Sequence, residues 1–509
     1  MFERTMMLES EPDERVDHES PRRPLPAESR SVDRDEPLLA DMLALWRELL
    51  DQPELSADAD FFASGGRSLL AIQLLQRVRR TLGLPIPLDT LISASTPRRF
   101  AERLAVLRAE HHRDEPAADR RAARSAAGEL DRALAEALGE VRHLGVQLYV
   151  SIAGEPVHDL VAGHREDSTP LEPDDLLPWF SGGKPLVAAS LAELWRRGSL
   201  DPNEPVATYL PAFGVGGKNA ITLRHLLTHS SGRLLTDDPA DADPYSVGYE
   251  RAVRGALGAR LHPDDVPGRQ PSYSSSAIGW LTLSEVIRQV DGREFDRFVT
   301  DEIAGPLGAT YHYGFSADEL RALGGRVGAY HQHRAAQFSS PQEAQTGAAS
   351  RRLLASGVVH KIRHPGEGLW ASARSMARFY ELLCRLAVGD ARNAGPEGPL
   401  DTPTVQQMIR PQRLSFFDEA PLIDFGLGLT LESRRHGEEY AYYGSHTSPR
   451  TFGHQGHGSS PMAYVDPEHD LVVAFNGNGL PGFAAGKSIW HRISDALYRD
   501  LGLASPTAR

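Results

Sequence analysis

Two strand-like runs, one near each end of the long C-terminal segment, limit the folds open to this chain. Residues 146–152 alternate apolar and polar side chains, and a second run at 157–161 follows closely enough to form a hairpin. Residues 471–475 have the continuous apolar pattern of a buried strand, and a closing helical pattern follows them. Because helical patterns fill the sequence between, we expect one sheet assembled from distant segments.

Length and charge set the broad class of the protein. At 509 residues the chain exceeds what one hydrophobic core supports, so we expect two or three domains. Its formal net charge of −14 argues against a nucleic-acid partner. The N-terminus lacks the apolar run of a signal peptide, and we find no uninterrupted stretch of about 18 apolar residues. We therefore expect a cytoplasmic protein with no membrane partner. The single cysteine, Cys384, is expected to pack in the core.

The N-terminal part of the chain divides into three stretches of different composition. Residues 1–35 are dense in charged residues, serine and proline, which is typical of a disordered tail. Between residues 36 and 108, apolar side chains recur at helical spacing, which predicts a small all-α helical bundle. Residues 109–128 have the composition of a linker. A flexible linker of about twenty residues has a root-mean-square span of roughly 25 Å.

This helical segment carries a recognisable signature. It reads Asp-Phe-Phe at residues 60–62 and Gly-Gly-Arg-Ser-Leu at residues 65–69. The pattern resembles the peptidyl-carrier domains of peptide and polyketide assembly lines, although Ser64 and Arg67 depart from the usual residues. The resemblance implies that Ser68 carries covalent 4′-phosphopantetheine, and that the partners include a phosphopantetheinyl transferase and an adenylating or acyl-loading enzyme. The alternative interpretation is that Ser68 only caps a helix.

A serine and a lysine lie one helical turn apart in the second half of the chain. Residues 181–184 read Ser-Gly-Gly-Lys and open an apolar, helix-forming run. Because a helix places residues i and i+3 on one face, Lys184 can reach the hydroxyl of Ser181 as its base. The positive end of the helix dipole favours negative charge that develops nearby. Such a short pattern is common by chance, so its partners must be found elsewhere in the chain.

Two further motifs follow in a fixed order, Tyr-Ser-Ser at residues 273–275 and His-Gln-Gly at residues 454–456. Together with residues 181–184 they resemble the serine hydrolases of the class C β-lactamase and penicillin-binding-protein superfamily, which includes esterases and transacylases. The resemblance covers nearly all of residues 130–505. It implies an α/β domain at residues 129–505, with an antiparallel sheet flanked by helices and a helical subdomain.

The resemblance also implies a role for each motif residue. Ser181 is the nucleophile, Lys184 its motif partner and Tyr273 the tyrosine of the second motif. A serine hydroxyl near its ordinary pKa is a poor nucleophile, so an uncharged lysine or a tyrosinate must take its proton. The sequence leaves open which of the two does so. Ser275 stands where the family has asparagine, which lowers the expectation of β-lactam hydrolysis.

The third motif is expected to line the site. By resemblance, the backbone N–H groups of Ser181 and His457 form the oxyanion hole, whose donors are typically worth about 3 kcal/mol each. Gly456 is expected to let the substrate approach closely. His454 replaces the lysine of β-lactamases and would hold a substrate carboxylate less firmly. Because no third ligand is evident, we do not expect His454 and His457 to bind a metal.

Joining the two halves predicts acyl transfer in natural-product biosynthesis, in the manner of nonribosomal peptide or polyketide assembly. An acyl or aminoacyl group on the Ser68 pantetheine thiol would pass to Ser181 and then to a small-molecule amine or hydroxyl acceptor. Three alternatives remain open. In the first, the chain is a thioesterase that releases the acyl group to water. In the second, it is an esterase or peptidase that acts on free small molecules, and in the third it is a docking protein without catalysis.

Overall fold

The computed structural model describes most of the C-terminal part of the chain and parts of the N-terminal segment. The described residues are 36–50, 52–65, 70, 74, 78, 90, 91, 94–111, 128–139, 142–269, 271–328, 357–389, 398–417, 420–433, 441–457 and 460–504. The predicted tail at residues 1–35, most of the predicted linker and Ser68 lie outside them.

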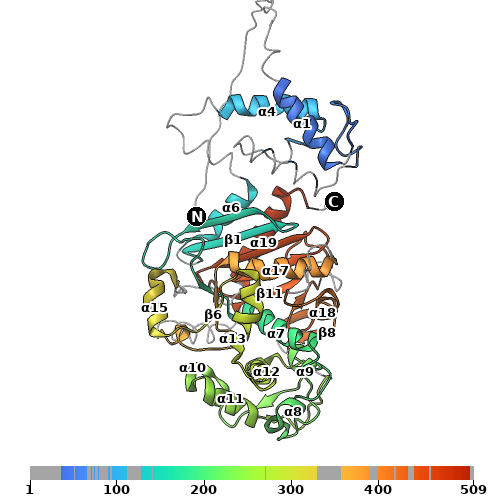
Figure 1. Ribbon diagram of the computed structural model, residues 1–509. Helices are drawn as coiled ribbons and strands as arrows, with labels where there is room; N and C mark the ends of the chain where they lie inside the picture. Colours follow the sequence, from blue (N-terminus) through green and yellow to red (C-terminus); the bar gives the residue numbers. More distant parts are fainter. Residues whose placement is uncertain are drawn as a thin grey trace, which may run out of the picture.

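The N-terminal segment contains the predicted amphipathic helices α1 (Glu36–Leu49) and α4 (Pro97–His111), which pack against each other (Figure 1). Their core is aromatic: the ring centroid of Trp46 lies 5.6 Å from that of Phe61 and 5.2 Å from that of Phe100. Asp60 holds the intervening turn, because its carboxylate accepts backbone hydrogen bonds from Phe62 and Ala63 at 2.9 Å. This arrangement confirms the predicted helical core of the N-terminal segment.

The C-terminal part is built on one large antiparallel sheet, in which eight strands fall within the described residues. In spatial order the strands are β2 (Glu155–Gly163), β1 (Gly145–Ile152), β13 (Leu471–Gly477), β12 (Met462–Asp466), β11 (Phe452–Gln455), β10 (Thr430–Leu431), β9 (Ala420–Phe425) and β8 (Arg413–Phe417). The predicted hairpin is β1 and β2, and the predicted last strand, β13, pairs directly with β1.

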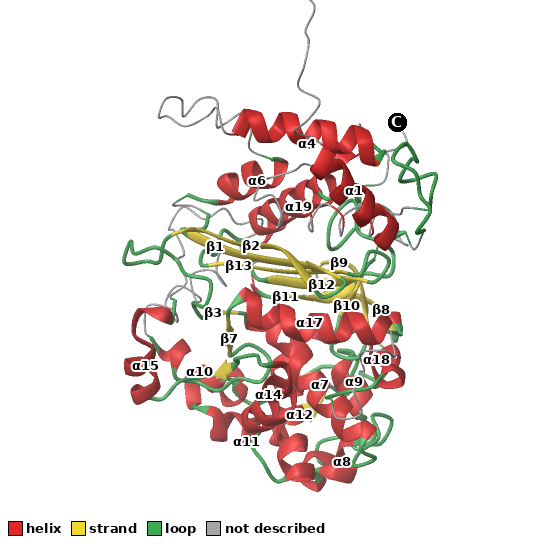
Figure 2. Ribbon diagram, turned by 45° about the horizontal axis from the view of Figure 1, so that its top comes forward, coloured by secondary structure: helices red, strands yellow, loops and turns green. Residues whose placement is uncertain are grey.

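Helices cover both faces of this sheet, as the view in Figure 2 shows. On one face, α6 (Glu129–Ala137) and α19 (Phe483–Asp500) pack on alternate side chains of β1, including Leu148 and Val150. On the other face, α17 (Ala373–Val388) packs on β1, β12 and β13. Tyr149 points to this second face and its hydroxyl donates to the Glu381 carboxylate at 3.2 Å. The alternating pattern of residues 146–152 therefore separates two helical layers and does not separate core from solvent.

A helical subdomain inserted between β2 and β8 lies beyond α17, away from the α6 and α19 face (Figure 1). Its α-helices are α7 (Lys184–Arg196), α8 (Val206–Tyr209), α9 (Leu223–Leu227), α10 (Pro244–Val247), α11 (Tyr249–Gly258), α12 (Ser276–Asp291), α13 (Phe295–Phe298), α14 (Gly305–Leu307), α15 (Ala317–Leu323) and α18 (Thr402–Met408). Its short turns are η1 (Phe180–Gly183), η2 (Pro211–Gly214), η3 (Pro239–Ala242), η4 (Tyr273–Ser275), η5 (Val299–Ala304), η6 (Gly324–Arg326) and η7 (Val358–His360).

Two small sheets connect these helices. One has the order β3 (Leu177–Pro178), β7 (Leu369–Ala371) and β6 (His312–Tyr313), and the other pairs β4 (Leu234–Leu235) with β5 (Arg260–Leu261). Cys384 is buried in α17, as predicted from its helical spacing. Within the described part of the chain, no helix has the length and hydropathy needed to cross a membrane.

Candidate active site

The predicted nucleophile lies in a tight turn at the start of a buried helix. Ser181 is in η1, and α7 begins at Lys184, so the prediction of a helix start is confirmed. The Lys184 Nζ donates to the Ser181 Oγ at 2.5 Å. The backbone of Phe180 has a positive φ of 44°, a conformation that costs energy in a residue with a side chain. This strained turn places the Ser181 hydroxyl within hydrogen-bonding distance of the Lys184 amine.

The two glycines between Ser181 and Lys184 are required by close packing. A Cβ atom on Gly183 would lie 2.6 Å from the Cβ of Leu369 in β7. A Cβ atom on Gly182 would lie 3.1 Å from the Trp179 ring. The turn that carries Ser181 thus packs closely against Trp179, which precedes it, and against Leu369 of the small β3–β7–β6 sheet.

Burial changes the chemistry of Lys184. Its side chain is 1% exposed, and its Nζ also donates to the Gly366 carbonyl oxygen at 3.0 Å. The Trp280 ring lies beneath the amine, with its centroid 6.0 Å from Nζ. Burial lowers the pKa of Lys184 to about 8, against the opposing attraction of Glu367. About one lysine in ten is therefore uncharged at pH 7.

Tyr273 of the second motif also reaches the nucleophile. It lies in η4, at the start of α12, and its side chain shares a hydrogen bond with Ser181. Burial raises the pKa of Tyr273 to about 12, the Glu367 charge raises it further, and the bond to Ser181 opposes both. The His229 ring packs on Tyr273 with 4.7 Å between centroids. Ser181, Lys184 and Tyr273 are thus brought together, as the motif order predicts.

The third residue of the second motif is used within the fold. The Ser275 Oγ accepts a hydrogen bond from the Leu234 N–H at 2.7 Å, and the Ser275 side chain is buried. This bond ties η4 to β4. A serine hydroxyl at this position therefore supports the turn that carries Tyr273.

His454 lies on β11 and faces the same buried cluster. Its Nδ1 is 2.6 Å from the Gln455 carbonyl oxygen, which indicates that this nitrogen carries the proton. Burial lowers the pKa of His454 to about 3, and repulsion by Lys184 adds to the effect. The imidazole is therefore neutral at physiological pH, and weak binding of a substrate carboxylate by His454 stays a prediction.

The reason for a glycine at position 456 differs from the one predicted. A Cβ atom there would lie 2.4 Å from the Trp179 carbonyl oxygen and 2.2 Å from the Pro461 Cγ. The space beside Gly456 is thus filled by protein and is not left for substrate. The glycine lets the end of β11 close onto the turn that carries Ser181. His457 follows on the exposed side, with its ring centroid 5.7 Å from that of Phe180.

Several residues of this cluster were not identified from the sequence. His229 is buried with a positive φ of 51°, and it stands in the Thr-His-Ser-Ser-Gly stretch at residues 228–232. Glu367 precedes β7 and its charge acts on Lys184 and Tyr273. Tyr245 and His364 stack at 5.6 Å beside it. A charged residue set between two glycines before a buried strand is the signal that could have identified Glu367.

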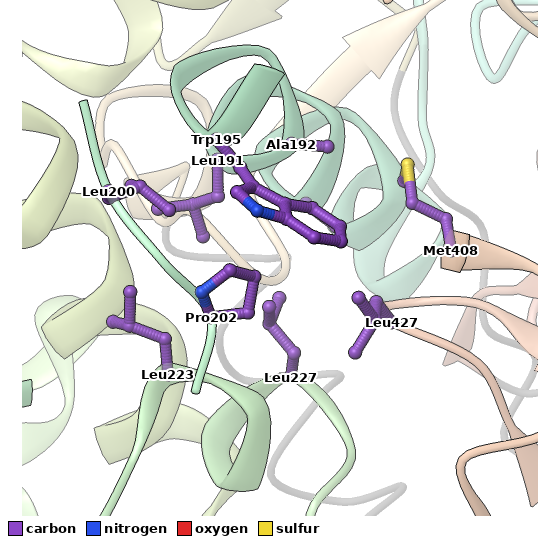
Figure 3. A pocket seen from close by; sticks show the side chains of 10 residues that line it. Leu191, Ala192, Trp195, Leu200, Pro202, Leu223, Leu227, Met408 and Leu427 are labelled. Carbon is purple, nitrogen blue, oxygen red and sulfur yellow. The ribbon is translucent and has the colours of Figure 1, made fainter. Parts of the chain in front are cut away.

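Two hollows lie apart from the nucleophile. The first is apolar, is lined by later turns of α7 together with α9 and Leu427 (Figure 3), and has room for about 10 Å³, roughly one water molecule. The second, of about 460 Å³, is polar and lies around β6 and η5. It backs onto the nucleophile turn, because the Tyr313 hydroxyl donates to the Gly183 carbonyl oxygen at 3.2 Å. Neither hollow includes Ser181 or Lys184.

The described residues differ in how well they suit a covalent cofactor and a metal ion. The segment that leads to Ser68 suits a covalent attachment, because Phe62, Ala63 and Gly65 are exposed there. In the described ranges, no group of three or more histidine, cysteine, aspartate or glutamate side chains is arranged to hold a metal ion. The arrangement around Ser181 supports nucleophilic acyl chemistry by protein groups.

Known protein families match both the N-terminal segment and the C-terminal part of the chain. The beta-lactamase family matches residues 130–498, and the phosphopantetheine attachment site family matches residues 40–104. Esterase/beta-lactamase LipL of Mycobacterium tuberculosis is 28% identical over 381 residues, which cover 69% of this chain and 80% of LipL. Pyochelin synthetase PchF of Pseudomonas aeruginosa is 37% identical over 156 residues, which cover 30% of this chain and 8% of that protein.

A solved structure shows the same fold. A penicillin-binding protein homolog from Caulobacter crescentus superimposes with a TM-score of 0.60 and 24% identity, covering 73% of this chain and 96% of that chain. The family match spans the sheet, the helical subdomain and all three motifs that meet at Ser181. This chain therefore belongs to the beta-lactamase family of serine hydrolases and carries, ahead of that enzyme domain, a domain for covalent attachment of 4′-phosphopantetheine.

Proposed function

We propose that the protein is a carrier-tethered serine acyltransferase of natural-product biosynthesis. One observation carries the proposal: a buried lysine of lowered pKa lies 2.5 Å from the Ser181 hydroxyl, in a chain that also has a phosphopantetheine attachment domain. A pantetheine arm ends in a thiol that holds acyl groups as thioesters. Ser68 is the proposed attachment residue, and Ser181 the proposed acceptor of the acyl group.

In the first step Ser181 is acylated. Its Oγ forms a bond to the thioester carbonyl carbon, the C–S bond breaks, and the serine proton passes through the base to the departing thiolate. Lys184 suits the role of base, since with a pKa of about 8 roughly one lysine in ten is neutral at pH 7. With a pKa of about 12, only about one Tyr273 in 10⁵ is ionised. Tyr273 then acts as a hydrogen-bonding group that orients Ser181.

In the second step an acceptor replaces the serine. The acceptor nitrogen or oxygen bonds to the acyl carbon, the Ser181 ester bond breaks, and the acceptor proton returns through Lys184 to the Ser181 oxygen. The backbone N–H groups of Ser181 and His457 are the proposed donors to the negative oxygen of each tetrahedral intermediate. Phe180, the residue before Ser181, has its ring in contact with the ring of His457, which supports the placement of the two N–H donors beside one another.

Three other functions are alternatives to acyl transfer. A thioesterase uses the same acyl-enzyme and differs only in its acceptor, which is water. An esterase or peptidase on free small molecules would leave the carrier to serve another enzyme. A docking protein without catalysis is disfavoured, because the contacts of Lys184 and Tyr273 with Ser181 are intact. The proposed partners are a phosphopantetheinyl transferase, an acyl-loading enzyme and a small-molecule acceptor, and the proposed compartment is the cytoplasm.

The proposal is tested by following one acyl group along the full-length protein. A phosphopantetheinyl transferase and isobutyryl-coenzyme A load the carrier, and peptide mass mapping follows the isobutyryl group with time. We expect it to move from the Ser68 peptide to the Ser181 peptide. In Ser181→Ala it stays on Ser68, whereas the exposed control Ser199→Ala behaves as the wild type.

Added acceptors separate transfer from hydrolysis. A butylamine series is expected to give the amide in proportion to amine concentration, whereas a thioesterase gives only the free acid. Absence of any acyl group on Ser181, together with unchanged turnover in Ser181→Ala, would show that the covalent mechanism is wrong.

A further inference from the structure

Glu367 is a carboxylate beside the nucleophile for which the mechanism above has no use. It lies in a turn held tightly against the catalytic lysine. The Gly368 N–H donates to the His364 carbonyl oxygen at 2.7 Å, and the Gly366 N–H donates to the His364 Nδ1 at 3.1 Å. The Gly366 carbonyl oxygen, one residue before Glu367, accepts from the Lys184 Nζ at 3.0 Å. The backbone of this turn is thus fixed relative to Ser181.

The Glu367 carboxylate is partly buried and is not used by the fold. Within the part of the chain that the structure describes, it forms no hydrogen bond and no ion pair. It is nevertheless close enough to act on the pKa values of Lys184, Tyr273 and Tyr245. Burial raises the pKa of Glu367, but the nearby His364, Lys184 and His457 lower it, and the net shift is below the ordinary value. A partly desolvated carboxylate without a direct hydrogen bond or ion pair favours a cationic ligand.

Tyr245 supplies a second unused polar group from the other side of the site. It comes from α10, and its ring stacks on His364 at 5.6 Å with an interplanar angle of 20°. The Tyr245 Oη is buried and has no hydrogen-bond partner among the described residues. Burial raises its pKa well above the ordinary value, and the Glu367 charge adds to that effect, so the hydroxyl stays protonated. Its oxygen is free to accept a hydrogen bond from a ligand ammonium.

The groups whose charges act on Glu367 are His364, Lys184 and His457, and none of them forms an ion pair with it among the described residues. Burial lowers the pKa values of His229, His364 and His454 below the ordinary value, so all three rings are neutral at pH 7. The positive charge of Lys184 also acts on Glu367, but its amine is held by Ser181 and Gly366. The site therefore contains a carboxylate that no described side chain engages directly and that can receive a substrate cation.

We propose that Glu367, together with the Tyr245 hydroxyl, binds the ammonium group of an aminoacyl substrate and so selects aminoacyl over neutral acyl groups for transfer to Ser181. The inference rests on the proposed function, since it names the class of acyl group that the pantetheine thiol delivers. It predicts a specificity residue that recognises charge next to the reacting carbonyl.

The test compares two thioesters of equal shape and different charge. L-Alanyl- and isobutyryl-N-acetylcysteamine differ in having an ammonium group in place of a methyl group. The kcat/KM of each is measured at pH 7 with the full-length protein, and the rate with Ser181→Ala is subtracted as background. The variants are Glu367→Gln and Tyr245→Phe, with Glu155→Gln as a control because Glu155 is an exposed glutamate at the edge strand β2.

The wild type is expected to prefer the alanyl thioester. In Glu367→Gln that preference falls about 10- to 100-fold, as expected for loss of a charged hydrogen bond, while isobutyryl turnover is retained or rises. Tyr245→Phe has a smaller effect in the same direction. Because Lys184 serves both substrates, the ratio of the two kcat/KM values removes any change in the base. Equal losses on both substrates, or no alanyl preference in the wild type, would overturn the proposal.

Failure of this inference can be told apart from failure of the proposed function. If isobutyryl and alanyl groups both reach Ser181 equally well, the acyl-enzyme mechanism stands and the role of Glu367 is wrong. If neither group appears on Ser181, the acyltransferase proposal itself is wrong. Thermal denaturation of each variant checks that the loss of preference is not a loss of folding.

Discussion

At the scale of single residues, the site depends on how burial divides protons between Lys184 and Tyr273. The same desolvation lowers the lysine pKa and raises the tyrosine pKa, since it disfavours the charged form of each. Burial therefore favours the neutral form of each group beside Ser181, the amine of Lys184 and the phenol of Tyr273. Glu367 moves both pKa values upward, because a negative charge stabilises the ammonium and destabilises the tyrosinate.

The lowered pKa of Lys184 predicts how the reaction rate depends on pH. With the isobutyryl thioester, which has no titratable group, kcat/KM is expected to rise with pH and level off above the Lys184 pKa of about 8, because only the neutral lysine accepts the serine proton. Glu367→Gln removes a charge that raises this pKa, so the midpoint should move to lower pH. Glu155→Gln should leave it in place. A midpoint near the ordinary lysine value, or one unmoved in Glu367→Gln, would contradict the assignment of Lys184 as base.

At the scale of elements, the site forms where four pieces of chain meet: η1, η4, the end of β11 and the turn before β7. Two of the junctions are closed by a glycine that meets another segment at a distance too short for a side chain, as Gly183 meets Leu369 and Gly456 meets Trp179. Packing of this kind leaves few alternative positions for the nucleophile.

The junction at Gly456 predicts a specific defect. In Gly456→Ala the added methyl group would collide with the Trp179 carbonyl oxygen and Pro461, and β11 must move away from η1. We expect kcat to fall about 10²-fold, as for a displacement of about 1 Å at a reacting group, and stability to fall by about 1–3 kcal/mol.

Enzyme kinetics and thermal denaturation measure these two effects. Gly258→Ala in α11 is the matched control, because a Cβ atom there meets no atom within 4 Å. If kcat is unchanged in Gly456→Ala, the close approach of β11 does not position the nucleophile.

At the scale of the whole molecule, the enzyme domain and the attachment domain have separate cores. Trp46, Phe61 and Phe100 form one, and the two faces of the large sheet form the others. Separate cores allow the two functions to be removed separately. A predicted linker with a span of roughly 25 Å suits a carrier that delivers its acyl group to the attached enzyme.

Ser68→Ala tests this separation. The variant should take no pantetheine and should lose all transfer of carrier-bound acyl groups, whereas its kcat/KM on free isobutyryl-N-acetylcysteamine should remain within about twofold of wild type. Loading by phosphopantetheinyl transferase, followed by intact mass, and steady-state kinetics measure the two outcomes. Ser56→Ala, at an exposed serine of the same domain, should load normally. A parallel loss of activity on the free thioester would mean that the carrier supports the enzyme domain structurally.

Features that depend on local spacing could be predicted from the amino-acid sequence. The i, i+3 placement of Ser181 and Lys184, the alternation in β1, the apolar run of β13 and the helices of the carrier all follow from neighbours along the chain. The order of the three motifs was sufficient to predict the family, and the family match agrees with it. Tyr273 and His454 were predicted as members of one site from the resemblance that these motifs carry.

Features that depend on contacts between segments far apart in the chain could be seen only in the tertiary structure. The burial that lowers the Lys184 pKa comes from Trp280 and the turn before β7, and the need for a glycine at position 456 comes from Trp179. Tyr245 lies in no sequence motif, and the glycines that flank Glu367 do not show what it faces, because the importance of both residues arises from where α10 and the turn before β7 bring them. Local spacing therefore fixes which groups can react, and long-range packing fixes their charge and the substrate they suit.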